Sequence, residues 1–506
     1  MLRKVALNLL SAGLLILSFP RFNLEFLVWF AFVPLFFALE EKSKFKSFLL
    51  SYFTGVIFWL GIVYWLIHVT LPGMIILVLY LALYFGIFGL IISCYRLQAT
   101  GYRLFSIPAI WVLLEYLRSH LFTGFAWALL GYSQYLNLPI IQLADITGVW
   151  GISFLVMMVN VVIKEIICYR LQAIGYRKSI KKLLFLAFSM WLVACGYGFF
   201  RLNQNIEGNK LRISVIQGNI PQEFKWDPNS KNFIIDRYIN LTRQAIKDRP
   251  DLIVWPEAAL PVVLEEEPVF YGKTKDFVRE IKIPLLLGAV TSKDKLYYNS
   301  ALLISAEGRL LNKYDKLHLV PFGEYIPLRK TLGFLQTVVP IGDFSRGKEY
   351  TIFKIQNSKL KTQNSFAVLI CFEDLFPELS RSFAKKDADF LINITNDAWF
   401  KMTSSPYQHL QASVFRAVEN RVALIRSANT GVSGFIAPTG KIISLVEDRK
   451  GRNIFISGYD TEEIIITKRN LSFYTRYPDI FIIACFLIIL FGMIPRIRSK
   501  PKPKSR

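Results

Sequence analysis

Long apolar runs occupy the chain before residue 202 and return between residues 479 and 494, whereas the middle is mixed in polarity. A membrane-spanning helix needs roughly 20 apolar residues. Two runs, at 5–19 and 26–39, are shorter and predict a tight hairpin that enters the bilayer incompletely or crosses a thin one. With the runs at 48–67, 74–94, 105–122, 150–168, 183–200 and 479–494, the pattern predicts a polytopic α-helical membrane bundle of about eight spans.

The middle of the chain alternates short β-branched runs with helical segments, which is typical of a layered α/β domain. We therefore predict an N-terminal bundle at 1–202, an α/β domain at 203–477 that begins with a linker at 203–210, and a C-terminal span with a basic tail at 478–506. The predicted strands lie at 212–217, 252–255, 284–290, 300–304, 366–370, 390–395, 422–427 and 433–437.

Composition supports a membrane protein independently of the apolar runs. With 53% hydrophobic and 15% aromatic residues, the chain is too apolar for an ordinary soluble protein of 506 residues. Its mean hydropathy is +0.38. The basic residues at 3–4 and the following apolar run resemble a secretory signal, but residues 18–21 lack a small-residue cleavage site, so we expect an uncleaved first helix.

The formal net charge is +23, and many of the basic residues lie in alternate loops between the predicted spans. By the positive-inside rule, these loops and both termini face the cytoplasm, so the α/β domain faces outward, into the periplasm of a two-membrane bacterium. Anionic lipid headgroups of this inner membrane account for the charge, and the chain shows no nucleic-acid motif. The basic residues are Arg3, Lys4, Lys42, Lys44, Lys46, Arg96, Arg103, Arg170, Arg177, Lys178, Lys181, Lys182 and the tail at 496–506.

Cys371 is the one cysteine of five that lies outside the apolar segments, so it has no partner for a disulfide within its domain. It follows the strand-like run 366–370 and precedes a helical segment with acids at its start. A strand-to-helix turn exposes the sulfur and directs backbone N–H groups and the helix dipole at it, which favours a thiolate. The alternative is a buried, inert cysteine.

Glu257 and Lys316 are the candidate companions of Cys371. Glu257 ends the apolar segment 251–257, so it lies at a strand tip, where α/β folds place their chemistry. Lys316 lies in the loop 314–327, which is dense in Pro, Gly and aromatic residues. Each residue alone fits a solvated surface charge, but the order Glu, Lys, Cys, each with its own flanking residues, forms a specific signature.

This trio resembles the Glu-Lys-Cys catalytic set of the nitrilase superfamily. The resemblance narrows to the bacterial apolipoprotein N-acyltransferases and covers nearly the whole chain. It implies an α-β-β-α sandwich on a membrane bundle, and transfer of a phospholipid acyl chain to the N-terminal S-diacylglyceryl-cysteine of lipoproteins. The segments that carry it are 121–127, 131–134, 255–257, 316–327, 371–378 and 393–400.

The three groups suit a ping-pong reaction through a thioester. Cys371 would be the nucleophile, and Glu257 would accept the thiol proton and return it to the leaving oxygen. Lys316 would stabilise the oxyanion together with backbone N–H groups, and its ammonium would also raise the thiolate fraction.

Four further residues are candidates for supporting the site. Glu324 and Glu373 are expected to hold Lys316 and the polar groups around it, because an unpaired charge in a dry cleft is costly. The alternative for both is a solvated acid. Trp226 and Trp399 are candidate substrate-binding residues at the wet edge of the cleft.

Metal and cofactor chemistry is not indicated. Only His318 and His409 lie in the α/β domain, without the close spacing of a metal site. A Cys-His dyad through His318 stays open, although we favour packing of His318 within its loop. We expect no cofactor.

Two apolar segments of the α/β domain, 332–340 and 261–264, fit two interpretations. They are either lids that enter the membrane interface or line an acyl tunnel, or they are ordinary core packing.

The alternative function is a membrane-tethered nitrilase-type amidase that sends water to the thioester. A third interpretation is a catalytically silent scaffold or a transporter. A transporter would carry ionisable residues within its membrane spans. Glu115 and Arg118 fit that description, but their i, i+3 spacing also allows a local ion pair.

Two residues depart from the pattern of the family. Phe372 stands where Tyr commonly follows the nucleophile, and Lys401 stands where Gly is usual. A further oddity is a near-identical segment at 94–103 and 168–177, which we interpret as a duplication tolerated in basic loops.

Overall fold

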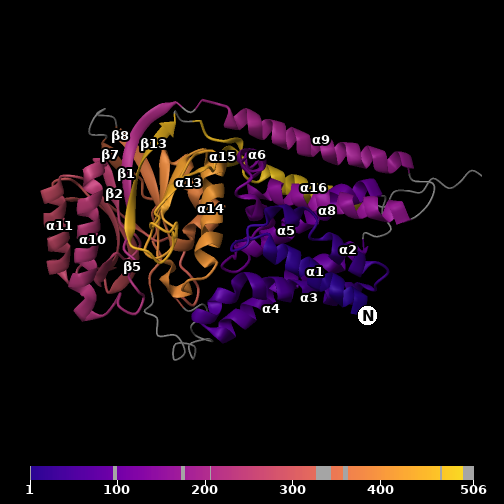
Figure 1. The fold of residues 1–506 in the computed structure, drawn as a ribbon, viewed down its shortest axis with the longest axis horizontal. Helices are drawn as coiled ribbons and strands as arrows, with labels where there is room; N and C mark the ends of the chain where they lie inside the picture. The colour runs from indigo at the N-terminus through magenta and orange to yellow at the C-terminus, as the bar shows by residue number, and fades with distance from the viewer. Residues whose placement is uncertain are drawn as a thin grey trace, which may run out of the picture.

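The computed structural model describes residues 2–94, 100–171, 177–205, 207–325, 344–356, 363–467 and 470–493. A bundle of helices and an α/β domain lie end to end along the long axis (Figure 1). The apolar segment 332–340 and the basic tail lie wholly outside the described residues, and half of each duplicated segment does.

The helical bundle contains stretches long and apolar enough to cross a membrane. In the described part of the chain these are Lys44–His68, Leu71–Cys94, Val149–Cys168 and Leu184–Leu202. The predicted hairpin is present, but its second arm is broken into η1 and α2. The count of eight spans stays a prediction. The bundle consists of α1 (Leu2–Leu17), η1 (Glu25–Trp29), α2 (Val33–Leu39), α3 (Lys44–Val63), η2 (Tyr64–His68), α4 (Leu71–Cys94), α5 (Thr100–His120), η4 (Leu130–Gln134), α6 (Leu138–Ile141), α7 (Ala144–Thr147), α8 (Val149–Leu171), α9 (Arg177–Leu202) and α16 (Ile480–Met493).

Large apolar side chains project from the outside of the bundle. On α9, Phe185 is 75% exposed and Val193 is 71% exposed, and on α16 Phe491 is 68% exposed. Such a surface is costly in water and favourable in lipid, so the exposed residues support a membrane setting for these helices.

The α/β domain contains two sheets, and every one of the eight predicted strands is present. The first sheet has the order β13-β1-β2-β4-β5-β6 with β3 beside β4, and the second has the order β12-β11-β10-β9-β8-β7. The strands are β1 (Gly208–Gln217), β2 (Leu252–Val254), β3 (Leu260–Val263), β4 (Leu285–Lys293), β5 (Leu296–Ile304), β6 (Leu310–Asp315), β7 (Phe353–Gln356), β8 (Gln363–Ile370), β9 (Phe390–Thr395), β10 (Ala423–Ala428), β11 (Gly434–Ile436), β12 (Ile442–Leu445) and β13 (Gly458–Thr467).

The sheets are the two inner layers of a four-layer sandwich (Figure 1). Alternate residues of a strand point to opposite faces, so Leu252 and Val254 of β2 join the core between the sheets while Ile253 packs under the helices. Helices α10 and α11 cover the first sheet, and α13 and α14 cover the second (Figure 1). These helices span Lys231–Ala245, Pro268–Ile281, Pro377–Lys385 and Ser405–Asn420.

For one of the two apolar segments, the structure distinguishes between a lid and core packing. Residues 260–263 form β3, which pairs with β4, and Leu260 and Val262 are buried in the core. This segment is therefore core packing and not a lid. The predicted linker is also shorter than expected, because β1 begins at Gly208.

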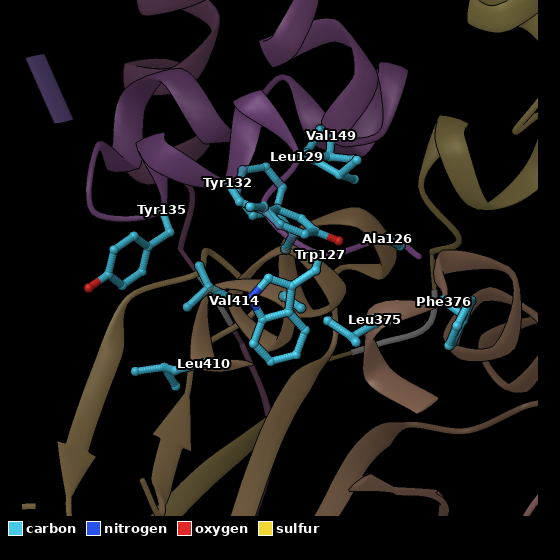
Figure 2. Close-up of a cluster of buried hydrophobic side chains, with 14 of the residues drawn as sticks. Ala126, Trp127, Leu129, Tyr132, Tyr135, Val149, Leu375, Phe376, Leu410 and Val414 are labelled. Carbon is cyan, nitrogen blue, oxygen red and sulfur yellow. The ribbon is translucent and has the colours of Figure 1, made fainter. Parts of the chain in front are cut away.

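The second sheet's helices pack against the bundle through a buried apolar junction. Trp127 of the bundle lies beside Leu375, Leu410 and Val414 of the α/β domain (Figure 2). Its indole Nε1 donates to Gln408 Oε1 at 2.7 Å, and Trp65 donates to the same oxygen at 3.1 Å. The helical bundle is therefore tied directly to α14 by two hydrogen bonds.

Candidate active site

The predicted trio follows the carboxyl ends of three strands. Glu257 comes soon after β2, Lys316 directly follows β6, and Cys371 directly follows β8. Because β2 and β8 belong to different sheets, the site lies where the two layers meet. Carboxyl ends of strands are where α/β folds leave their side chains free for ligands.

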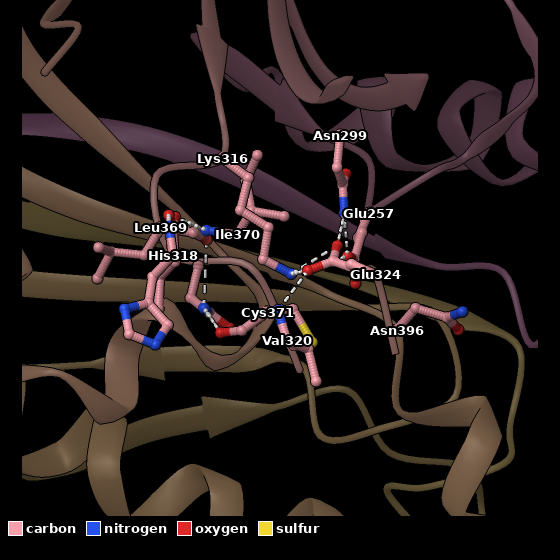
Figure 3. Close-up of polar contacts among 12 residues, drawn as sticks. Glu257, Asn299, Lys316, His318, Val320, Glu324, Leu369, Ile370, Cys371 and Asn396 are labelled. Atoms are coloured by element: carbon pink, nitrogen blue, oxygen red, sulfur yellow. Dashed lines mark hydrogen bonds and ion pairs between the residues drawn. The ribbon is translucent and has the colours of Figure 1, made fainter. Parts of the chain in front are cut away.

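A compact polar cluster joins these residues (Figure 3). Lys316 Nζ lies 2.9 Å from Glu324 and 3.8 Å from Glu257 Oε1. Asn299 Nδ2 donates to Glu257 Oε1 at 2.7 Å and to Glu324 Oε1 at 2.9 Å. The predicted supporting role of Glu324 thus has a geometric basis, because this carboxylate holds the ammonium while Val320 N donates to its other oxygen.

Lys316 is buried, yet its ammonium group stays protonated. Its side chain is only 1% exposed. Burial by itself lowers the pKa of Lys316, but the carboxylates of Glu324 and Glu257 outweigh burial and raise that pKa above its usual value. The site therefore contains a fixed positive charge near the sulfur.

Cys371 occupies a sharp turn between β8 and the short helix η8 (Cys371–Leu375). Its φ of 55° lies in the left-handed region, which few non-glycine residues adopt. Asn393 Nδ2 donates to the carbonyl oxygens of Leu369 and Cys371, at 3.2 and 2.9 Å, and so fixes the turn. The predicted strand-to-helix placement of the thiol is confirmed, but the expected exposure of the sulfur is wrong, because Cys371 is 8% exposed.

The predicted increase in the thiolate fraction of Cys371 is wrong for the site without substrate. Burial raises the pKa of the Cys371 thiol well above its usual value, the negative charge of Glu257 adds to the rise, and Lys316 offsets it only in part. The local helix end and the nearby lysine favour the thiolate, but desolvation of the buried sulfur outweighs both. The thiol is therefore neutral until a base removes its proton.

Glu373 supports the loop that carries Lys316. Its carboxylate is fully buried and accepts hydrogen bonds from the Tyr314 hydroxyl and from the backbone N–H groups of Leu317, His318 and Ile370, at 2.7 to 3.0 Å. Burial raises the pKa of Glu373 to about 7, against the opposing effect of the backbone donors. The side chain thereby links the end of β8 to the loop after β6.

We expect Glu373→Gln to destabilise the protein by about 3 kcal/mol, because an amide NH₂ would face buried N–H donors that the carboxylate now satisfies. The measurement is the free energy of unfolding in detergent. Glu280→Gln is the matched control, since Glu280 pairs with Arg243 on the exposed surface, and it should change stability by less than about 0.5 kcal/mol. Equal stability of the two variants would contradict the role assigned to Glu373.

The remaining candidates take different positions. The His318 ring stacks on Phe376 with centroids 3.7 Å apart, and burial lowers the pKa of His318 to about 4, so this side chain packs in its loop as expected. Trp226 and Trp399 are 46% and 51% exposed, on the loop after β1 and on η9 (Asp397–Phe400). Their predicted contact with substrate stays a prediction.

Both departures from the family pattern have a structural account. Phe372 packs its ring against the aromatic rings of Trp127, Phe400 and His409, with centroids 5.3 to 5.8 Å apart. Lys401 has φ 51° and ψ −163°, a region essentially confined to glycine. The usual glycine is thus explained by the backbone of the turn after η9.

Glu115 and Arg118 bind the backbone of the segment that carries Trp127. Arg118 donates to the carbonyl oxygens of Phe125 and Trp127, at 2.8 and 2.7 Å. Glu115 Oε1 accepts from Leu130 N at 2.6 Å. These buried side chains therefore shape the junction with the α/β domain, which gives both of them a structural role.

Asn299 and Asn393 are two residues of the site that were not predicted as such from the sequence. Asn299 is a buried polar residue that interrupts the apolar run of β5, and Asn393 does the same in β9. An amide in a buried strand needs hydrogen-bond partners, so this interruption was the available signal. In the described residues, no group of three or more His, Cys, Asp or Glu side chains has the arrangement of a metal site.

Comparison with known proteins gives the family. Residues 11–162 match the apolipoprotein N-acyltransferase N-terminal domain, and residues 212–477 match the carbon-nitrogen hydrolase family. The apolipoprotein N-acyltransferase of Geobacter metallireducens is 40% identical over 504 residues, which cover 96% of this chain and 93% of that protein. The chain belongs to the apolipoprotein N-acyltransferase family.

A second relative, the apolipoprotein N-acyltransferase of Chlorobaculum tepidum, is 28% identical over 525 residues, covering 98% of this chain and 97% of that protein. Among solved structures, an amidase from Nesterenkonia sp. is 19% identical with a TM-score of 0.39, and the match covers 54% of this chain and 94% of that one. The resemblance seen in the sequence is confirmed: the protein is an acyltransferase of the carbon-nitrogen hydrolase superfamily.

Proposed function

We propose that the protein transfers an acyl chain from a phospholipid, through a thioester on Cys371, to the α-amine of the S-diacylglyceryl-cysteine that begins an apolipoprotein. The observation that carries the proposal is the convergence of a buried thiol, the Lys316 ammonium and the Glu257 carboxylate at one site. That site lies on a domain docked to apolar helices long enough to cross a membrane.

In the first half of the reaction, Cys371 Sγ attacks the carbonyl carbon of the acyl ester while Glu257 takes the thiol proton. The neutral thiol requires this base, because burial disfavours a free thiolate. Lys316 Nζ stabilises the oxyanion of the tetrahedral intermediate. The ester C–O bond then breaks, Glu257 returns the proton to the leaving oxygen, and lysophospholipid departs.

In the second half, the α-amine of the acceptor attacks the thioester carbon. Glu257 takes a proton from the amine, the C–S bond breaks, and the sulfur of Cys371 regains the proton. The products are an amide and the free thiol, so the cycle needs no cofactor. A thioester suits this step because it reacts with amines and persists where water is excluded.

The membrane setting follows from the donor, because an enzyme that attacks a phospholipid ester needs its cleft at the headgroup level. We place the protein in the bacterial inner membrane with about eight spans, cytoplasmic termini and a periplasmic α/β domain. Exposed Trp226 and Trp399 then lie at the rim of the cleft, where the amphipathic indole suits the membrane interface.

The test is the intact mass of the detergent-purified protein after incubation with phospholipid. We expect a mass increase of one acyl chain that hydroxylamine removes, that a diacylglyceryl-cysteine peptide removes with formation of its amide, and that persists in buffer alone. An adduct that water clears as fast as the peptide does would instead establish the tethered amidase, and no adduct with any phospholipid would overturn the proposal.

A further inference from the structure

The loop after β1 carries a cation on the inside and aromatic side chains on the outside. Phe224 and Trp226 are 51% and 46% exposed, whereas Lys225 between them is 2% exposed. Usually the lysine is exposed and the aromatic rings are buried. The observed arrangement is costly, because the buried ammonium loses its hydration and the exposed rings leave apolar surface in water. Such a position requires that the cation interacts with something inside the site.

Lys225 reaches the backbone of the proposed base. Its Nζ donates to the main-chain oxygen of Glu257 at 3.0 Å. An ammonium has three N–H donors, and this is the one hydrogen bond that Nζ makes within the chain the structure describes. The loop itself is anchored nearby, where Asn396 Nδ2 donates to Gln222 Oε1 at 2.9 Å.

The two lysines of the site differ in their ionic partners. Lys316 is shared between the carboxylates of Glu257 and Glu324, so most of its charge is already compensated. Lys225 contacts a carbonyl oxygen and has no carboxylate in an ion pair within the described chain. Its positive charge acts on Glu257 and on the Cys371 sulfur, the two groups between which the proton moves.

We propose that Lys225 is a positioning residue of the same reaction, which holds Glu257 through its main chain and supplies the uncommitted positive charge that stabilises the Cys371 thiolate when Glu257 takes its proton. The proposal rests on the proposed function above. Before the transfer, two ammonium groups face two carboxylates. After it, Glu257 is neutral and the sulfur carries the negative charge, so the total charge is unchanged but has moved toward Cys371.

The charge of Lys225 depends on pH in the accessible range. Burial lowers the pKa of Lys225 to about 8, and the carboxylate of Glu257 opposes this change. The other charged groups that face Cys371 are Glu257, Lys316 and Asp397. Above pH 8 the sulfur therefore loses the contribution of Lys225 while Lys316 stays charged.

The test is the rate at which iodoacetamide alkylates Cys371 in the full-length, detergent-purified protein between pH 6 and 10, followed by the mass of the peptide that contains Cys371. At pH 7 we expect Lys225→Met to react roughly tenfold more slowly than the wild type, which corresponds to about one unit in the thiol pKa. Lys225→Arg should restore the alkylation rate at pH 7. In the wild type, the alkylation rate should rise less steeply with pH above pH 8, and this change should be absent from Lys225→Arg, because arginine stays charged.

Lys247→Met is the control for loss of a positive charge, because Lys247 is exposed on the same domain, and its profile should match the wild type. Identical profiles for Lys225→Met and the wild type would overturn the proposal. The proposal would also be overturned if the Met and Arg variants lost alkylation rate equally and kept the pH dependence of the wild type. That result would assign Lys225 a packing role. Alkylation needs no lipid, so this outcome is independent of whether the wild type forms an acyl adduct.

Discussion

Cys371→Ala is expected to abolish the acyl adduct and all N-acylation of a diacylglyceryl-cysteine peptide. No second thiol stands near the site, because the other four cysteines lie in or beside the bundle helices. The variant should fold normally, since replacing one sulfur atom in a side chain that is 8% exposed removes little packing. The measurements are the intact mass after incubation with phospholipid and the yield of acylated peptide.

Cys195→Ala is the matched control, because Cys195 is a half-buried thiol on α9. It should form the adduct at the rate of the wild type. An acyl adduct that survives in Cys371→Ala, or one that disappears in Cys195→Ala, would show that the acyl chain is carried elsewhere.

Glu257→Gln should slow adduct formation by about 10²- to 10⁴-fold, the usual contribution of a general base. The effect should be large here because burial holds the Cys371 thiol neutral and leaves proton removal to Glu257. The amide keeps the volume of the side chain, and its carbonyl oxygen can still accept the hydrogen bond of Asn299. Single-turnover rates of adduct formation would measure the loss.

The control for this substitution is Glu266→Gln, whose carboxylate accepts from the Tyr297 hydroxyl on the exposed surface. Its rate should equal that of the wild type. If Glu257→Gln stays within threefold of the wild type, the base is another group and the assignment of Glu257 is wrong.

The strands that the sequence predicted and those that it missed differ in their place in the sheets. All eight predicted strands are present, and their β-branched runs are mostly buried. Four of the five missed strands, β6, β7, β12 and β13, are the edges of the two sheets. An edge strand keeps one side in solvent and carries polar residues, so its apolar pattern is weak.

The class of the molecule, the proposed trio Glu257, Lys316 and Cys371, and the position of the thiol at a strand-to-helix turn could all be predicted from the sequence alone. These depend on local features: runs of apolar residues, and strand ends marked by polar side chains. The folded structure was needed to show that Asn299 joins two carboxylates, that Lys225 reaches Glu257 from a distant loop, and that burial raises the pKa of the thiol. Burial and through-space charge arise when segments far apart in the chain pack together, and no local pattern records them.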